Sequence, residues 1–177
     1  MQTRFSAPAL GALLLVAAAA QAQDAKPPED KSKRPSPPAT ASAVVNGTTV
    51  TIDYSRPSLK GRKAFGELEP YGKVWRTGAN EATTFTVDKA VKINGKALAA
   101  GKYSLFTIPT ATNWTVIFNK EPNQWGAYKY KESDDVLRVM VPAKKLASPV
   151  EVFDITVDKA GKVALKWDMT EVDFTVK

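Results

Sequence analysis

The sequence of 177 residues contains no cysteine and no histidine. Without thiols, the chain cannot form disulfides, a cysteine nucleophile or a thiolate metal site. Without imidazoles, it cannot form a Ser-His-Asp triad or a histidine-ligated metal site. Neither a G-x-S-x-G nucleophile elbow nor a glycine-rich phosphate-binding loop occurs. These absences leave carboxylates as the main catalytic groups, and we expect no metal and no cofactor.

The N-terminal residues have the pattern of a signal peptide. Arg4 precedes an apolar stretch, residues 7–20, and Ala20-Gln21-Ala22 matches the small-x-small cleavage pattern. We therefore predict a signal peptide over residues 1–22 that is cleaved after Ala22. The apolar stretch is too short for a membrane-spanning helix, which needs roughly 20 residues. An exported protein without cysteine fits a bacterial periplasm or the secreted space, and we expect no membrane span.

Composition divides the remaining chain into a tether and one domain. Residues 23–42 are rich in proline and in charges of both signs, which predicts a disordered, proline-rich tether. Residues 43–177 have the length of a single folded domain. The formal net charge of +7 is dispersed rather than clustered in a basic stripe, so we expect no nucleic-acid partner.

Hydrophobic residues alternate with polar residues along most of the domain. Val50, Ile52 and Tyr54 show the period of two that is typical of strands with one buried face. Asn46-Gly47 and Asn94-Gly95 are strong signals for two-residue hairpins. We predict an all-β fold, a single antiparallel β-sandwich or a flattened barrel of about nine or ten strands. We place in the core the aromatic residues of the regular strands: Tyr103, Phe106, Trp114, Phe118, Phe153, Trp167 and Phe174.

Three segments interrupt the alternation and carry the candidate ligand-binding residues. Residues 54–62 leave a strand with several cations, residues 71–81 surround a glycine turn, and residues 119–130 place aromatic and amide side chains around Gly126. A guanidinium can form paired hydrogen bonds with a polar ligand, and carboxamide and carboxylate groups can also hydrogen-bond to it. An indole can stack on it. The predicted site residues are Arg56, Arg62, Trp75, Arg76, Asn80, Glu81, Asn123, Gln124, Trp125 and Tyr128.

Several of these residues also have a purely structural interpretation. Trp75 and Arg76 are adjacent in a predicted strand, so one faces the core and the other faces the ligand site. Arg76 either binds a ligand or forms an ion pair with Glu81. Asn80 either contacts the ligand or caps the turn. Trp125 is either a stacking platform or a lid over the end of the sandwich.

Five ordered motifs resemble one protein family. They are YSRPSLKGR, FGELEPYGKVWRTGANEATTF, GKYSLFTIP, WTVIFN and NQWGAY. In these motifs, which lie within residues 50–157, the chain resembles the domain of unknown function 2911 family of exported bacterial proteins. The resemblance implies a secreted or periplasmic β-rich domain with no assigned activity, and it supplies no catalytic residues.

Three functions remain open. The first, which we favour, is a non-catalytic module that binds a small polar or carbohydrate-like ligand in the cell envelope. The second is a carboxylate-based hydrolase of an envelope glycan, with Glu81 as its acid or base. The partner carboxylate would come from Asp53, Glu67, Glu69 or Asp88. The third is a structural or interaction protein of the envelope.

Overall fold

The computed structural model describes residues 29–177. The predicted signal peptide, residues 1–22, and the first part of the predicted tether lie outside the described residues. Within residues 29–177, no helix is long and apolar enough to cross a membrane.

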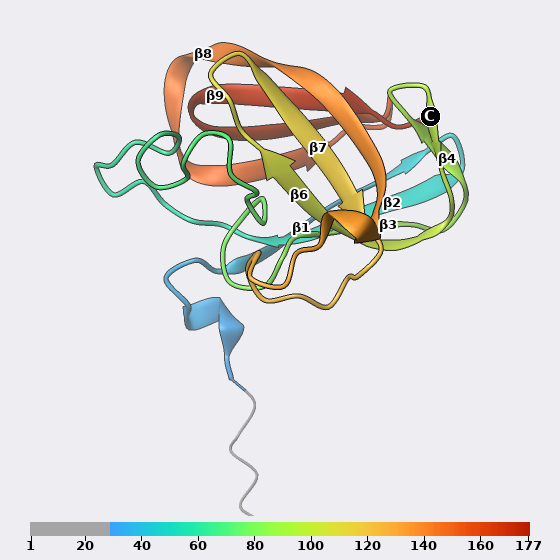
Figure 1. The fold of residues 1–177 in the computed structure, drawn as a ribbon, viewed down its shortest axis with the longest axis horizontal. Coiled ribbons are helices and arrows are strands. Elements are labelled where there is room, and N and C mark those ends of the chain that lie inside the picture. The colour runs from blue at the N-terminus through green and yellow to red at the C-terminus, as the bar shows by residue number, and fades with distance from the viewer. Residues whose placement is uncertain (1–28) are drawn as a thin grey trace, which may run out of the picture.

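The described chain is built almost entirely from β-strands (Figure 1). In residues 29–177, two short 3-10 turns, η1 (Lys31–Lys33) and η2 (Glu132–Asp134), are the only helical elements. The prediction of an all-β fold with about nine strands is therefore confirmed. The described strands are β1 (Pro38–Val45), β2 (Thr48–Ser55), β3 (Thr84–Val87), β4 (Val91–Ile93), β5 (Lys96–Leu98), β6 (Gly101–Ile108), β7 (Asn113–Asn119), β8 (Asp135–Val157) and β9 (Lys162–Thr175).

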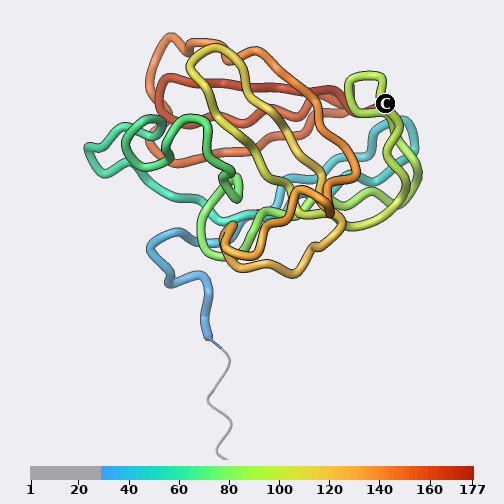
Figure 2. The backbone as a smooth tube through the Cα atoms, viewed as in Figure 1, coloured from blue at the N-terminus to red at the C-terminus, as the bar shows by residue number. Residues whose placement is uncertain are grey.

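One antiparallel sheet holds seven strands in the order β1-β2-β3-β6-β7-β8-β9, and β4 and β5 form a separate hairpin. The sheet curls because the long strand β8 pairs through residues 135–142 with β7 and through residues 143–157 with β9. The second half of β8 returns to the end of β2, where the Phe153 N–H donates to the Pro57 carbonyl at 2.9 Å. The result is a flattened, partly closed barrel, as Figures 1 and 2 show.

Two of the predicted hairpins are confirmed. Asn46-Gly47 connects β1 to β2, and Asn94-Gly95 connects β4 to β5. All four turn residues have the positive φ that such two-residue turns need. The first turn joins the directly paired residues Val45 and Thr48, so it sets the register of the β1–β2 hairpin.

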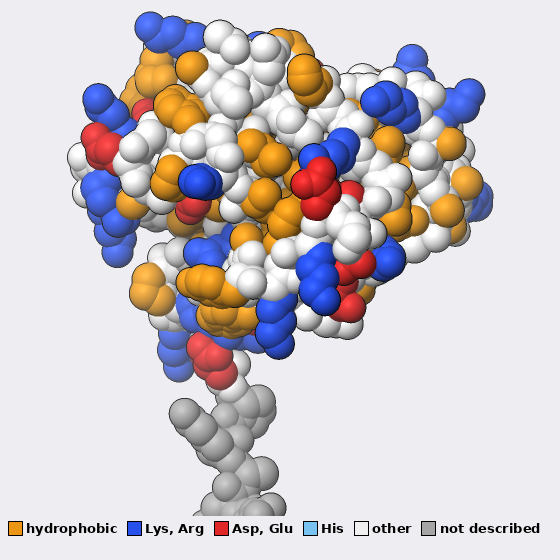
Figure 3. Space-filling model, in the orientation of Figure 1, with side chains coloured by type: hydrophobic (Ala, Val, Ile, Leu, Met, Phe, Trp, Pro, Cys, Tyr) orange, Lys and Arg blue, Asp and Glu red, His pale blue; other side chains and the backbone are white. Residues whose placement is uncertain are grey.

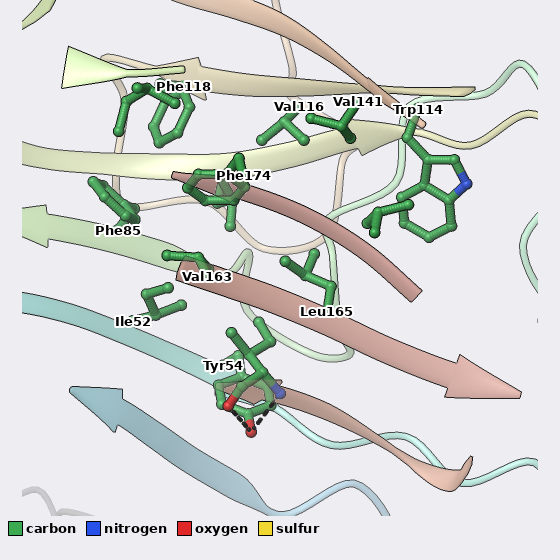
Figure 4. Close-up of a cluster of buried hydrophobic side chains, with 14 of the residues drawn as sticks. Ile52, Tyr54, Phe85, Trp114, Val116, Phe118, Val141, Val163, Leu165 and Phe174 are labelled. Atoms are coloured by element: carbon green, nitrogen blue, oxygen red, sulfur yellow. Dashed lines mark hydrogen bonds between the residues drawn. The ribbon is translucent and has the colours of Figure 1, made fainter. Parts of the chain in front are cut away.

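The inner face of the curled sheet holds the main hydrophobic core. Side chains from four strands meet there, as Ile52, Phe85, Phe118 and Phe174 show in Figure 4. All seven strand aromatics that the sequence places in the core are buried. One of them, Phe106, lies in a smaller second cluster, which forms the outer face of β6 and β7.

Two irregular loops cover this outer face. Val74 comes from the loop between β2 and β3, and Ala127 and Tyr130 come from the loop between β7 and β8; all three pack on the second cluster. A backbone bridge between Glu81 and Trp125 joins the two loops to each other. Two of the three predicted site segments therefore lie side by side on the outer face.

The first strand of the sheet begins before the predicted domain boundary. The predicted boundary is residue 43, but β1 begins at Pro38. β1 is an edge strand whose residues are mostly exposed or half-buried, so it lacks the apolar pattern of a core strand. Before β1, the Asp30 side chain caps η1 by accepting a hydrogen bond from the Ser32 N–H at 3.1 Å. Residues 29–37, which we call the N-terminal segment, therefore belong to the folded part of the chain.

Candidate functional site

Most of the predicted site residues line two hollows, which we call the sheet cleft and the Glu69 groove, and three of them, Asn123, Gln124 and Tyr128, also line a third hollow. The sheet cleft is lined by Glu81, Asn123, Gln124 and Trp125. The Glu69 groove is lined by Arg62, Trp75, Arg76 and Tyr128. The remaining two predicted residues, Arg56 and Asn80, line neither hollow.

The sheet cleft has a volume of about 500 Å³ and lies between the outer face of the sheet and the loop after β7. Its floor is polar because the strand register places Asp53 of β2 opposite Thr84 of β3 on the outer face. The neighbouring residues Ile52, Tyr54 and Phe85 belong to the core instead. Lys102 of β6 and Glu81 add one positive and one negative charge to the lining.

One wall of the sheet cleft is fixed by hydrogen bonds around Asn119, the last residue of β7. Its Oδ1 accepts from the Glu121 N–H at 3.1 Å and from Gln124 Nε2 at 3.2 Å. Its Nδ2 donates to Asp135 Oδ1 at 2.8 Å. Asp135 Oδ2 accepts in turn from the Tyr130 hydroxyl at 2.6 Å. This network, which we call the Asn119–Asp135 network, holds the loop over the sheet.

Two buried oxygen atoms of the sheet cleft have no hydrogen-bond partner among the described residues: Thr84 Oγ1 and Gln124 Oε1. Thr84 is 8 % exposed and Gln124 is 7 % exposed. The amide orientation of Gln124 is fixed, because both groups that contact its nitrogen are acceptors. A buried polar atom without a partner costs about 1–3 kcal/mol. Both residues line the cleft, so a ligand or an ordered water can satisfy these atoms once a small movement of the side chains exposes them.

Glu81 is held by the N-terminal segment and not by Arg76. Lys31 Nζ lies 2.8 Å from Glu81 Oε1, and an Arg34 terminal nitrogen lies 2.8 Å from Glu81 Oε2. Partial burial alone would raise the pKa of Glu81, but hydrogen bonds from these two cations and from its own backbone lower it to about 2. The carboxylate therefore stays ionised at neutral pH and is a weak base, which suits neither role in acid–base catalysis.

The N-terminal segment also contacts Asn80 and Trp125. Asn80 has a φ of 59°, and its Nδ2 donates to the Ser36 carbonyl at 3.0 Å. The Arg34 guanidinium carbon lies 5.7 Å from the centre of the Trp125 ring, which is a cation–π contact. Trp125 is nevertheless 54 % exposed. Asn80 thus holds the turn and the N-terminal segment, whereas Trp125 offers a partly open indole beside the cleft.

Trp75 belongs to the core. It is 3 % exposed and stacks on Trp167 with ring centres 5.7 Å apart, while three further aromatic rings meet it edge-on. Its indole N–H donates to the Gly78 carbonyl at 3.0 Å. Of the two arrangements open for this adjacent pair, the structure has the tryptophan inside and Arg76 facing the Glu69 groove.

The Glu69 groove consists of two adjoining hollows of about 170 Å³ and 360 Å³ that share Glu69. Arg62 lines the smaller hollow and Arg76 lines the larger one. Burial raises the pKa of the Glu69 carboxyl to about 7, although the positive charge of Arg76 favours its ionised form. Glu69 can therefore gain or lose a proton near neutral pH.

Arg56 ties the end of β2 to β8. Its Nε donates to the Phe153 carbonyl at 3.1 Å, and a terminal nitrogen donates to Asp154 Oδ1 at 3.0 Å. These bonds help to close the curled sheet, and they account for the cation that the sequence places after the strand.

Charged side chains are mixed on the face of the described residues that Figure 3 shows, where acidic, basic and apolar groups alternate. Within residues 29–177, no group of three or more acidic side chains is arranged to hold a metal ion.

Sequence reasoning missed Thr84 and the N-terminal segment. Thr84 lies in a regular strand pattern, in which nothing marks a threonine whose hydroxyl lacks a partner. Lys31 and Arg34 lie in a stretch with the composition of a tether, 50 and 47 residues before Glu81. Charges this far apart in the chain cannot be paired from sequence alone. In the sequence, Glu69 is only one of several candidate partner carboxylates. The burial of its side chain, which the structure shows, distinguishes it from the others.

One family model matches the chain. Its description is "Protein of unknown function (DUF2911)", and it matches residues 36–176. No curated protein and no solved structure matches the chain. The matched range includes all the described strands and both loops of the outer face, and it confirms the resemblance seen in the sequence motifs. The chain therefore belongs to the family described as "Protein of unknown function (DUF2911)".

Proposed function

We propose that the protein is a non-catalytic module that binds a small, uncharged, carbohydrate-like ligand in the sheet cleft. The observation that carries this proposal is that two residues lining one cleft, Thr84 and Gln124, each bury an oxygen atom without a described partner. A ligand hydroxyl can donate to Gln124 Oε1, and a second hydroxyl can exchange a hydrogen bond with Thr84. A ligand with several hydroxyl groups therefore relieves the unfavourable burial of both atoms.

The other groups of the sheet cleft also suit a saccharide. Asp53 and Lys102 offer an acceptor and donors for hydroxyl groups, and Asn123 adds a carboxamide. Trp125 adds an indole that can stack on a sugar ring. The volume of about 500 Å³ lies within the usual range of small-molecule sites. Given the predicted signal peptide, we propose that the ligand is a saccharide of the periplasm or cell envelope.

The hydrolase alternative lacks a suitable acid in this cleft. A glycosidase needs one carboxylic acid with a raised pKa close to a second carboxylate. The pKa of Glu81 is lowered to about 2, and the carboxyl whose pKa is raised, Glu69, lines the other hollow. The cleft therefore favours binding over hydrolysis.

Replacing Trp125 by alanine should weaken binding of an N-acetylglucosamine disaccharide by about tenfold, because the stacking surface is lost. Isothermal titration calorimetry measures this change. Tyr71→Ala is the matched control, since Tyr71 is 48 % exposed and lines neither hollow. We expect the control to bind as the wild type does. The proposal fails if the wild type binds no neutral disaccharide at millimolar concentration, or if both variants lose affinity equally.

Replacing Thr84 by valine should change stability and binding in opposite directions. Valine keeps the shape of the side chain and removes the hydroxyl without a described partner, so the free energy of unfolding should rise by about 1 kcal/mol. Affinity for the disaccharide should fall about fivefold, because one ligand hydrogen bond is lost. Thr86→Val on the same strand is the control for calorimetric unfolding and titration, and it should leave affinity unchanged. A loss of stability in Thr84→Val would show that the hydroxyl has a partner in the free protein.

A further inference from the structure

Three cations and one carboxyl group line the Glu69 groove. Lys60 and Arg62 line its smaller hollow, and Arg76 lines its larger one. The groove and the sheet cleft share no lining residue. A ligand in the groove therefore contacts a different set of residues from a ligand in the cleft.

The guanidinium of Arg76 retains donors for a ligand. Among the described residues, its one hydrogen-bond acceptor is the Gly78 carbonyl, which accepts from Nε at 3.3 Å. A terminal nitrogen of Arg76 lies against Gly126, where a Cβ would stand only 3.0 Å from it. Gly126 also has a φ of +65°, so a glycine lets the loop backbone pass close to the guanidinium. The remaining N–H groups of Arg76 are thus held at the hollow without a described acceptor.

Glu69 is a weak partner for these cations at neutral pH. The titratable and charged groups that share its two hollows are Arg76 and Tyr128 on one side and Lys60 and Arg62 on the other. Because burial raises the pKa of Glu69 to about 7, roughly half of its carboxyl groups are neutral at that pH. When Glu69 is neutral, the groove is strongly positive.

We propose that the Glu69 groove binds an oxyanion group, such as a sulfate, phosphate or carboxylate, through the fork of Arg76 and a hydrogen bond donated by protonated Glu69. A guanidinium matches two oxygen atoms of such a group at once. Lys60 and Arg62 attract the anion through their field. Deprotonated Glu69 repels the anion and competes for Arg76. Binding is therefore linked to the uptake of a proton, and it weakens as the pH rises.

Sulfate is the probe for this site, because it stays doubly charged across neutral pH. In NMR titrations of the protein at constant ionic strength, sulfate should bind about tenfold more tightly at about pH 6 than at about pH 8. Glu69→Gln keeps a neutral hydrogen-bonding group, so it should bind sulfate equally well at both pH values. Arg76→Gln should bind about tenfold more weakly at the lower pH. Lys92→Gln changes an exposed lysine on β4 and should bind as the wild type does.

A second titration identifies the source of the oxyanion. A disaccharide with one uronic acid should bind more tightly than sulfate if the group belongs to a saccharide, and no more tightly if the ligand is a free anion.

The proposal is overturned if sulfate does not saturate the protein at either pH, if its affinity does not change with pH, or if folded Arg76→Gln binds as the wild type does. If Arg76→Gln does not fold, Arg76→Lys keeps the charge without the fork and should bind sulfate more weakly than the wild type. Glu69→Gln should leave binding of the neutral disaccharide unchanged, so the two sites are tested separately.

Discussion

Replacing Trp75 by alanine should lower the free energy of unfolding by about 3–5 kcal/mol, because a large cavity opens in the core. The indole is 3 % exposed, stacks on Trp167 and donates a hydrogen bond to the Gly78 carbonyl. Its neighbours include Trp114 and Phe153, whose large rings cannot easily move into the vacated volume. Urea unfolding followed by circular dichroism measures the loss.

Trp125→Ala is the matched control for this change. It removes the same side chain at a position that is 54 % exposed, so the free energy of unfolding should fall by about 1 kcal/mol or less. Folded Trp75→Ala should still bind the disaccharide, because Trp75 does not line the sheet cleft. A stability loss below about 1 kcal/mol in Trp75→Ala would contradict its place in the core.

The position of Trp75 marks a limit of sequence reasoning. Where strands pair regularly, side chains alternate between the two faces of the sheet, so the sequence pattern predicts which residues are buried. It correctly predicted that the seven strand aromatics are buried. Trp75 and Arg76 lie where the chain makes only a single bridge, from Trp75 to Thr107 of β6. Without a ladder around them, alternation allowed both arrangements. Only the packing of Trp75 against Trp167 decides between them.

Local signals predicted the strands and turns, whereas the curling of the sheet depends on distant contacts. Asn46-Gly47 specifies a hairpin through the φ angles of two residues. By contrast, the return of β8 to β2 involves the Tyr54 hydroxyl, which accepts from the Ile155 N–H at 3.0 Å across 101 residues of sequence. No local pattern encodes such a pairing, so the sequence left the choice between a sandwich and a flattened barrel open.

The division of the candidate site has a local cause that the sequence did not reveal. Arg76 and Glu81 are close in the chain, yet they line different hollows. Between them, Thr77 and Asn80 have φ angles of 57° and 59°, so the backbone leaves the extended conformation and its regular alternation of side chains. An asparagine often adopts this conformation, but a β-branched threonine rarely does. The sequence therefore predicted suitable chemical groups without showing that they line two different hollows.

Replacing Asp135 by alanine should lower the free energy of unfolding by about 3 kcal/mol. The change removes a buried carboxylate, so the groups that donate hydrogen bonds to it lose their acceptor. The side chain is 6 % exposed. It accepts hydrogen bonds from Asn119 at 2.8 Å, from the Tyr130 hydroxyl at 2.6 Å and from Arg138 Nε at 2.8 Å. Asp134→Ala is the control, since Asp134 is the preceding residue and its side chain pairs only with Lys120 among the described residues, at 3.2 Å. We expect the control to lose about 1 kcal/mol or less in urea unfolding.

The Asp135→Ala substitution should also affect the sheet cleft. Asp135 orients Asn119, and Asn119 in turn holds the Glu121 N–H and the side chain of Gln124. When the Asn119–Asp135 network is broken, the loop should open more often, so the Glu121 amide should exchange its hydrogen faster than in the Asp134→Ala control. Disaccharide affinity should fall with it, because the side chain of Gln124, which lines the cleft, is no longer held by Asn119. Unchanged exchange and affinity in folded Asp135→Ala would mean that the loop is positioned by its packing on the second hydrophobic cluster, through Ala127 and Tyr130, and not by the network.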